Sequence, residues 1–319
     1  MKDLMKMAMI IAAITITMAA CKKEVHTSGP TGTPASKAEF FSTGAPAVQR
    51  FTITAGRYSS ITGAKGTRVQ FDYSSLLNSA GAPVTSGSVT VELQEMLTGP
   101  QMILAGKTTT SGGHLLISGG QVYLHVTQNG SELFVNPADK PILTIPTSSQ
   151  SQRMQLFVGS MVVPPSGTDS VIDWAPADTS VTVNPTYDSV SHSNAYSLPI
   201  TDFRYINCDY FYSYNQPLTD VHITLPSQNR DTNSRVYLYF PSINSVTELT
   251  GYSSGTNTFD LTSNYFIPIG IQANVVVVSW VGTQYYYQIL PITVTSNMQV
   301  TAAPVAETLS NIQAAIAAM

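Results

Sequence analysis

The chain has 319 residues, which at roughly 100–200 residues per domain corresponds to one to three globular units. Charged residues make up 11% of the chain and hydrophobic residues 43%. Globular proteins average about 25% charged residues, so the composition excludes a disordered polyelectrolyte. The net charge is −4, and 15 lysines and arginines provide no basic surface for phosphates. We therefore expect no nucleic acid among the partners.

The first 21 residues have the parts of a secretory signal that ends in a lipidation site. Two lysines precede an apolar run over residues 7–17, and two alanines stand directly before Cys21. This order resembles the bacterial lipobox, in which Cys21 is acylated and becomes the mature N-terminus after residues 1–20 are removed. The alternative is an ordinary cleaved signal with an incidental cysteine.

The lipidation site predicts where the protein resides. Three acyl chains hold a protein stably on a bilayer, so the membrane is one expected partner through the N-terminal anchor. Lys22 follows the cysteine, which favours the outer membrane. We expect a lipid-anchored outer-membrane protein, and both the periplasmic and the surface face stay open.

Composition divides the rest of the chain. Residues 21–49 are rich in Gly, Pro, Ser, Thr and Ala and have no apolar period, which is typical of a flexible tether. Residues 21–140 carry nine basic and seven acidic side chains, whereas residues 141–319 carry four arginines, no lysine and eleven acidic side chains. This step in charge predicts two modules, an N-terminal domain over 50–146 and a C-terminal domain over 147–297.

The N-terminal domain shows the alternation of apolar and polar residues that is typical of half-buried strands. Glycine-rich sequences lie between these alternating segments, and the pair Asn129-Gly130 follows the last of them. Glycine and asparagine accept the positive φ angles of tight turns. The pattern predicts an antiparallel sandwich. The alternating segments are residues 51–53, 69–73, 89–93 and 122–126.

The C-terminal domain repeats this period and contains a continuous apolar run, Val275 to Val278, which indicates a strand covered on both faces. A turn at Gly282 joins that strand to the next in a hairpin. In the tail, residues 298–319, apolar residues from Val305 to Ile316 fall at helical spacing. The predicted fold class is therefore all-β, with two antiparallel β-sandwich-like domains behind a lipoprotein signal and tether, and a short C-terminal helix.

Five segments carry a family resemblance. They are residues 81–95, Ile103-Leu104, Ser118-Gly119-Gly120, Tyr205-Ile206-Asn207-Cys208-Asp209 and Ile267-Pro268-Ile269-Gly270. They resemble signatures of a Bacteroidetes-type cell-envelope lipoprotein family with two β-rich domains and an Ile-Asn-Cys-Asp motif. The resemblance covers roughly residues 50–295 and implies an envelope location but no catalytic role. Family members often have Trp before the motif and Arg after it, where this chain has Tyr205 and Tyr210, so a contact shared through this motif would differ here.

The candidate nucleophiles lack the sequence context of catalysis. Gly251 to Gly255 matches the string of a nucleophile elbow around Ser253, but that turn needs a strand before it and a helix after it. Cys208 is the remaining thiol once Cys21 is acylated, and we interpret it as a buried structural residue. The five histidines and the acidic residues do not have metal-ligand spacing. We expect no catalytic residue, no metal site and no cofactor.

Two short strings are candidates for modification. Asp169-Ser170-Val171 and Asp188-Ser189-Val190 resemble the acceptor of Bacteroidetes-type O-glycosylation. Ser170 and Ser189 are therefore candidate glycosylation sites, although chance matches are common in a chain rich in Ser and Thr.

Tyrosines are concentrated in the second half of the chain, where 13 of the 16 lie between Tyr187 and Tyr287. In a strand, Tyr210, Tyr212 and Tyr214 would share one face. Tyrosine offers a ring for stacking on sugars and a hydroxyl for hydrogen bonds, so these three are candidate ligand-binding residues. The alternative is that they belong to the core, because tyrosine also favours strands.

These patterns predict a non-enzymatic, lipid-anchored cell-envelope protein that acts as a structural or interaction module. Besides the membrane, the expected partner is a neutral glycan or an envelope protein, because the acidic C-terminal half disfavours an anionic ligand. One alternative is a carbohydrate-binding surface lipoprotein beside an outer-membrane transporter. A weaker alternative is a hydrolase.

Overall fold

The computed structural model describes residues 33–148, 150–151, 153–163, 170–177, 181–190, 192–261 and 267–319. Residues 34–319 form one compact unit. About 51% of the chain is strand and 10% is helix, which confirms the predicted all-β class. The helices of the described chain are α1 (Lys37–Gly44), α2 (Gly99–Leu104), α3 (Leu309–Ala317) and the short 3-10 helix η1 (Pro241–Ile243).

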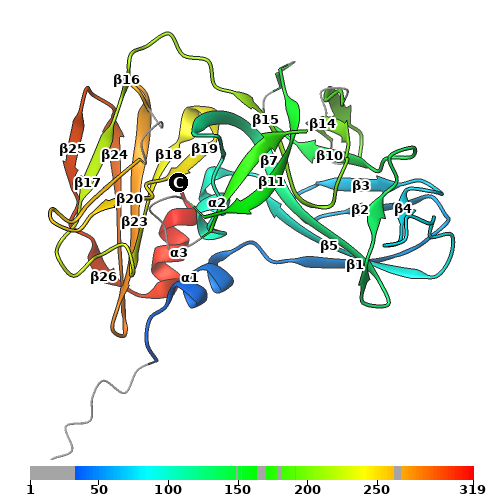
Figure 1. Ribbon diagram of the computed structural model, residues 1–319, viewed down its shortest axis with the longest axis horizontal. Helices are drawn as coiled ribbons and strands as arrows, with labels where there is room; N and C mark the ends of the chain where they lie inside the picture. The colour runs from blue at the N-terminus through cyan, green and yellow to red at the C-terminus, as the bar shows by residue number, and fades with distance from the viewer. Residues whose placement is uncertain are drawn as a thin grey trace, which may run out of the picture. The chain divides into compact units, whose positions relative to one another are not determined.

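Two sheets form the N-lobe, which spans residues 49–211 (Figure 1). Sheet 1 has the strand order β1 (Gln49–Thr54), β5 (Ser88–Met96), β7 (His114–Gln128), β15 (Arg204–Phe211), β11 (Gln155–Val162) and β12 (Val171–Pro176), with β6 (Thr110–Ser111) and β8 (Ser131–Glu132) paired to β7. Sheet 2 has the order β13 (Asn184–Asp188), β14 (Ser193–Pro199), β10 (Ile142–Pro146), β3 (Arg68–Phe71) and β2 (Ser59–Thr62). The short strands β4 (Leu76–Leu77) and β9 (Phe134–Val135) pair with each other.

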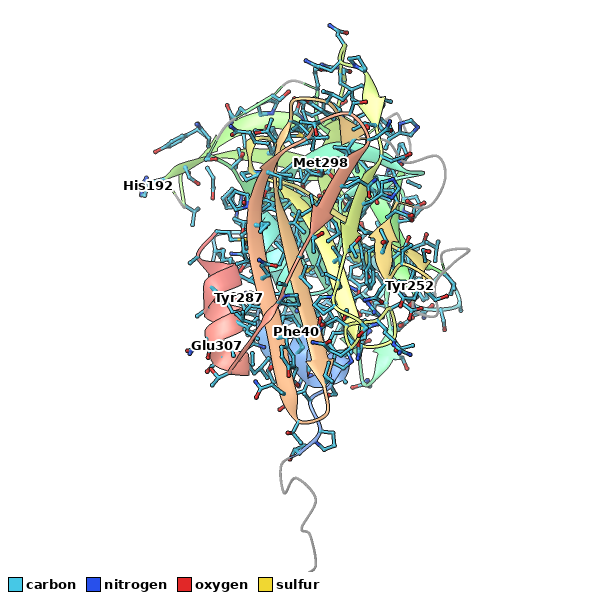
Figure 2. The ribbon with its side chains drawn as sticks, turned by 90° about the vertical axis from the view of Figure 1, so that its left-hand side faces the viewer. Phe40, His192, Tyr252, Tyr287, Met298 and Glu307 are labelled. Carbon is cyan, nitrogen blue, oxygen red and sulfur yellow. The ribbon has the colours of Figure 1, made fainter. Side chains whose placement is uncertain are left out.

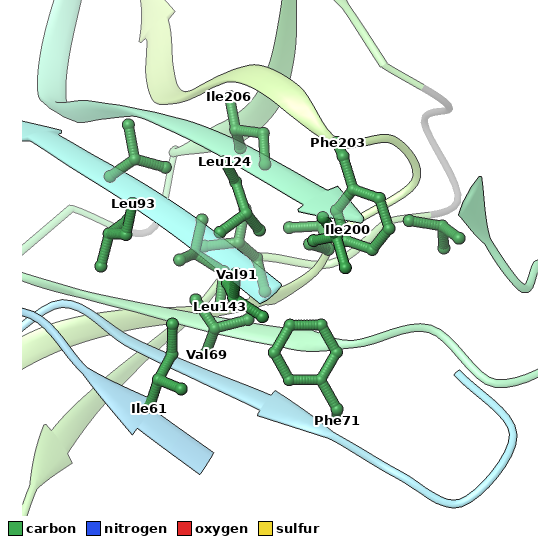
Figure 3. Packing of buried hydrophobic residues seen from close by; sticks show 14 of the residues in the cluster. Ile61, Val69, Phe71, Val91, Leu93, Leu124, Leu143, Ile200, Phe203 and Ile206 are labelled. Atoms are coloured by element: carbon green, nitrogen blue, oxygen red, sulfur yellow. The ribbon is translucent and has the colours of Figure 1, made fainter. Parts of the chain in front are cut away.

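Alternating residues of the predicted strands fill the space between sheets 1 and 2, but the prediction is wrong for Tyr73, which lies beyond the end of β3 and is 66% exposed. Val91, Leu93 and Leu124 come from sheet 1, and Val69 and Leu143 come from sheet 2 (Figure 3). All five side chains are completely buried. The polar residues between them point away from this core, because successive side chains of a strand face opposite sides of the sheet. The alternation in the sequence therefore distinguishes the buried face of each sheet from its other face.

Strands that follow residue 146 complete the N-lobe. Tyr196 of β14 pairs with Ile145 of β10, and Ile206 of β15 pairs with Val122 of β7. The expected boundary between residues 146 and 147 therefore falls inside the sandwich, whose last strand ends at Phe211. Charge changes along the chain near residue 140, but strand pairing is decided by packing in three dimensions and does not follow that change.

Two further sheets form the C-lobe. Sheet 3 has the order β20 (Gly251–Ser253), β21 (Thr258–Asp260), β17 (Val221–Thr224) and β25 (Met298–Thr301), and sheet 4 has the order β19 (Ser245–Glu248), β18 (Ser234–Phe240), β23 (Gln272–Val281), β24 (Gln284–Thr293) and β26 (Val305–Glu307). Strands β16 (Leu218–Thr219) and β22 (Ile267–Pro268) form a separate pair. Strand β25 runs parallel to β17, whereas the strands of sheet 4 pair antiparallel.

Strand β23 is buried on both faces, as its continuous apolar run predicts. Val275 and Val277 pack in the core between sheets 3 and 4. Val276 and Val278 face the opposite way, into a second apolar cluster that the three α-helices help to build. The predicted hairpin is also present, because β23 and β24 pair along their lengths around a turn at Gly282, whose φ is 61°.

Helix α1 lies within the segment that the composition assigns to a flexible tether. Ser36 caps it, since its hydroxyl accepts a hydrogen bond from the Glu39 amide at 3.1 Å. Phe40, labelled in Figure 2, is completely buried. It belongs to the helix-covered cluster of sheet 4, together with Ile312 of α3. Residues 37–44 are therefore a docked helix. The signal sequence and Cys21 lie outside the described residues.

The tail contains the predicted helix, but the helix is shorter than expected. It begins at Leu309, because Thr308 caps it and accepts a hydrogen bond from the Asn311 amide at 3.3 Å. Val305 belongs instead to β26 and pairs with Tyr287 of β24. Ile316 is completely buried against sheet 4. Within the described part of the chain, no helix reaches the length and hydrophobicity needed to cross a bilayer.

Candidate functional site

Two of the family-like segments, far apart in sequence, lie side by side in sheet 1. On β7 and β15, Asn207 pairs with Gln121 and Asp209 pairs with Ser118. Cys208 sits at an irregularity between these two pairs, where the register shifts. The Ser-Gly-Gly and Asn-Cys-Asp sequences thus form one β-bulge, and such bulges bend a strand and redirect its side chains.

The glycines of this bulge are required by close packing. A Cβ atom on Gly119 would lie 2.9 Å from the carbonyl oxygen of Cys208 and 3.0 Å from the ring of Tyr196. Gly120 has a φ of 117°, in the region that side chains other than glycine rarely adopt. The Gly-Gly pair therefore allows β7, β15 and the Tyr196 ring to approach one another.

Asp209 is a buried carboxyl group inside the bulge. Burial raises its pKa well above the ordinary value of 3.8, although the Ser118 hydroxyl, the Gly119 amide and the Asn207 side chain all favour the charged form. The Asn207 amide donates to one of its carboxylate oxygens at 2.5 Å. Burial in this bulge therefore favours the neutral form of the Asp209 carboxyl group.

Cys208 faces the opposite side of sheet 1 and belongs to the N-lobe core. Its thiol is completely buried, and burial, followed by the nearby Asp209, raises its pKa well above the ordinary value of 9.0. The prediction that Cys208 is buried is confirmed, and its structural role stays a prediction. Ser253 ends β20 and pairs with Thr258 of β21 in a hairpin, so it does not have the strand-to-helix setting of a nucleophile elbow.

A cleft of about 610 Å³ opens between the N-lobe and the C-lobe, next to the bulge. Ser118 and Gly119 of β7 line it, together with Tyr196 and Tyr210 from the N-lobe. From the C-lobe come Tyr239 at the end of β18 and the residues of η1. No charged side chain is among the lining residues that the structure describes.

Asn244 joins the two lobes beside this cleft. It follows η1 in the left-handed conformation, with a φ of 50°. Its side-chain amide donates to the carbonyl oxygens of Leu97 and Ser118 at 3.0 and 3.2 Å, and its carbonyl oxygen accepts from the Gly99 amide at 2.7 Å. These three hydrogen bonds hold the C-lobe against β7 and against the segment that follows β5.

The three candidate tyrosines do not form one platform. β15 ends at Phe211, so the alternation does not continue to Tyr212 and Tyr214. Tyr210 is half-buried against the N-lobe core, whereas Tyr212 packs against the core of the C-lobe. The ring centroids of Tyr212 and Tyr214 lie 5.8 Å apart. Of the three, Tyr210 is the one that lines the cleft.

The other predicted sites are surface positions or lie outside the described chain. Ser170 and Ser189 are both exposed, as a glycosylation acceptor requires, and their modification stays a prediction. The carboxylate of Asp188 lies 2.9 Å from a guanidinium nitrogen of Arg68. Asp169 and Cys21 are not among the described residues.

The polar groups of the cleft are hydroxyls, amides and backbone atoms, which suit binding. Over the residues that the structure describes, no group of three or more His, Cys, Asp or Glu side chains could hold a metal ion. Neither a protein-family model nor a curated protein matches the chain. Sequence reasoning missed Thr98, Ser242 and Asn244, and no sequence pattern indicates them, because they come together through the packing of the two lobes.

Proposed function

We propose that this chain is a non-enzymatic, lipid-anchored envelope protein that acts as an interaction module. The observation that carries the interaction role is the cleft between the lobes, whose uncharged hydroxyl and amide groups can hold a partner. The signal-like sequence before Cys21 supports the anchor. Location in the outer membrane is part of the same proposal.

The anchor is tested by labelling with a fatty-acid analogue and by membrane fractionation, in a bacterial host that processes lipoproteins. The wild type should incorporate the label and sediment with the outer membrane. Cys21→Ser should lose the label and stay soluble or uncleaved, whereas the control Cys208→Ala should keep the label. Recovery of the wild type as a water-soluble species that begins elsewhere than residue 21 would contradict the proposal.

Carbohydrate binding beside an outer-membrane transporter is the second candidate function. The uncharged lining of the cleft favours it, because neutral sugars match hydroxyl groups and aromatic rings. A neighbouring protein can also bind to such groups. Binding measurements on the cleft distinguish the two.

A further inference from the structure

We propose that the cleft between the two lobes binds a short neutral oligosaccharide, an inference that rests on the proposed interaction function and identifies its site. The volume of about 610 Å³ lies within the range of about 300–1,000 Å³ that small-molecule sites occupy in proteins. The ligand class follows from the lining.

The absence of charge along the described lining argues for an uncharged ligand. An anionic or cationic group placed in this cleft would lose water without gaining an opposite charge, which is costly. The buried carboxyl group of Asp209 is not among the residues that line the cleft. The guanidinium of Arg153 lies 5.1 Å from the centroid of the Tyr210 ring. Arg153 lines a neighbouring pocket and not this cleft.

The lining offers the two kinds of contact that a sugar makes. The hydroxyls of Thr98, Tyr210 and Ser242 form no hydrogen bond with any other residue that the structure describes, and they come from both lobes. The rings of Tyr210 and Tyr239 and the side chain of Ile117 provide apolar surface. A pyranose has hydroxyls around its edge and an apolar face of C–H groups, so it can use both.

The cleft is also held in one geometry before a ligand arrives. Asn244 bonds to Leu97 and Ser118, which both line the cleft. A second set of bonds joins the lobes nearby, where Thr109 and Val246 exchange backbone and hydroxyl hydrogen bonds of 2.7 to 3.3 Å. A site that is already ordered loses little conformational entropy on binding, which favours affinity.

The test uses the full-length chain in a zwitterionic detergent. A detergent with a sugar headgroup is avoided, because that headgroup would compete with the oligosaccharide for the cleft. An array of neutral and acidic oligosaccharides identifies ligands, and titration calorimetry gives the dissociation constant for the strongest neutral one. The variants are Ser242→Trp, which fills the cleft from an exposed position on η1, and Tyr210→Ala. Tyr214→Ala is the matched control, since Tyr214 does not line the cleft.

We expect binding to at least one neutral oligosaccharide, with the dissociation constant raised at least about tenfold by Ser242→Trp and by Tyr210→Ala. Tyr214→Ala should change it less than about twofold. Melting temperatures show whether Tyr210→Ala remains folded, and Ser242→Trp decides the outcome if it does not.

Three results would overturn the proposal. Binding to acidic oligosaccharides alone, or to none, refutes the ligand class. Neutral binding that Ser242→Trp leaves unchanged refutes the cleft as the site, while carbohydrate binding itself survives. Each of these results is independent of the Cys21→Ser experiment, so a failure here is distinct from a failure of the lipid anchor.

Discussion

The hydroxyl of Tyr285 lies 2.6 Å from a carboxylate oxygen of Glu39, although 246 positions separate the two residues in the chain. The same hydroxyl oxygen accepts a hydrogen bond from the Ser36 amide at 2.9 Å. These contacts attach the start of α1 to β24. They make the N-terminal helix part of the C-lobe.

Replacement of Phe40 by Ala should destabilise the protein strongly. Phe40 is completely buried among side chains of α2, α3 and sheet 4, and such truncations cost about 3–5 kcal/mol. Urea unfolding followed by tryptophan fluorescence gives the free energy. Val48→Ala is the control, since Val48 is 50% exposed and should cost less than about 1 kcal/mol. Equal effects of the two substitutions would show that α1 is not docked.

Replacement of Asp209 by Asn should change how stability depends on pH. The folded state raises the pKa of Asp209, so this residue binds a proton more tightly in the folded chain than in the unfolded chain. Its contribution to stability is therefore full below the unfolded pKa of about 3.9 and is lost as pH rises towards the folded pKa.

Asn cannot titrate, so the stability of Asp209→Asn relative to the wild type should increase between about pH 4 and pH 7. Urea titrations at several pH values measure this difference. Asp202→Asn serves as the control, because Asp202 is exposed. If Asp209→Asn and the wild type keep a constant difference in unfolding free energy across this range, the pKa of Asp209 is not raised in the folded protein.

The Cys208 thiol should resist modification in the folded protein. It is completely buried, and its pKa is raised well above 9.0, so thiolate is scarce and inaccessible. With Cys21→Ser as the background, a thiol reagent should label the chain in denaturant but not in native buffer. Labelling at equal rates in both conditions would mean that the N-lobe core is open around this residue.

Replacement of Gly119 by Ala should destabilise the N-lobe. The added methyl group would lie 2.9 Å from the Cys208 carbonyl oxygen and 3.0 Å from the Tyr196 ring, and overpacking of this kind costs about 1–3 kcal/mol. Gly255→Ala is a matched control, because a Cβ atom there meets nothing within 4 Å. The midpoint of thermal unfolding should be lower for Gly119→Ala than for Gly255→Ala. Equal midpoints would mean that the bulge relaxes without cost.

The sequence predicts best those elements whose signal is local. The alternation around Val91 and the continuous run from Val275 to Val278 predict strands with one and two buried faces, and both are present. The pair Asn129-Gly130 predicts a tight turn, and both residues have the positive φ angles, 50° and 81°, of a hairpin turn. Each of these signals depends on residues close together in the chain.

Features that depend on distant segments were not predicted. Ser36 followed by Glu39 is a capping-box signal before two aromatic residues, and it could have indicated α1 inside the presumed tether. No comparable signal exists for the membership of β15 in sheet 1 or for the position of Asn244 beside Ser118. Such contacts arise from tertiary packing, which a single sequence does not encode as a local pattern.

During synthesis the chain emerges with its N-terminus first, whereas the cluster that contains Phe40 of α1 also includes residues of α3, near the end of the chain. The last strand of the N-lobe ends at Phe211, so that sandwich has all its strands while the layer around Phe40 is still missing. Phe40 packs with Tyr285 and, in α3, with Ile312 and Ile316. A chain that stops before residue 309 would lack the part of this cluster that α3 contributes, so the cover over the first helix of the described chain is completed only by the last residues to be made.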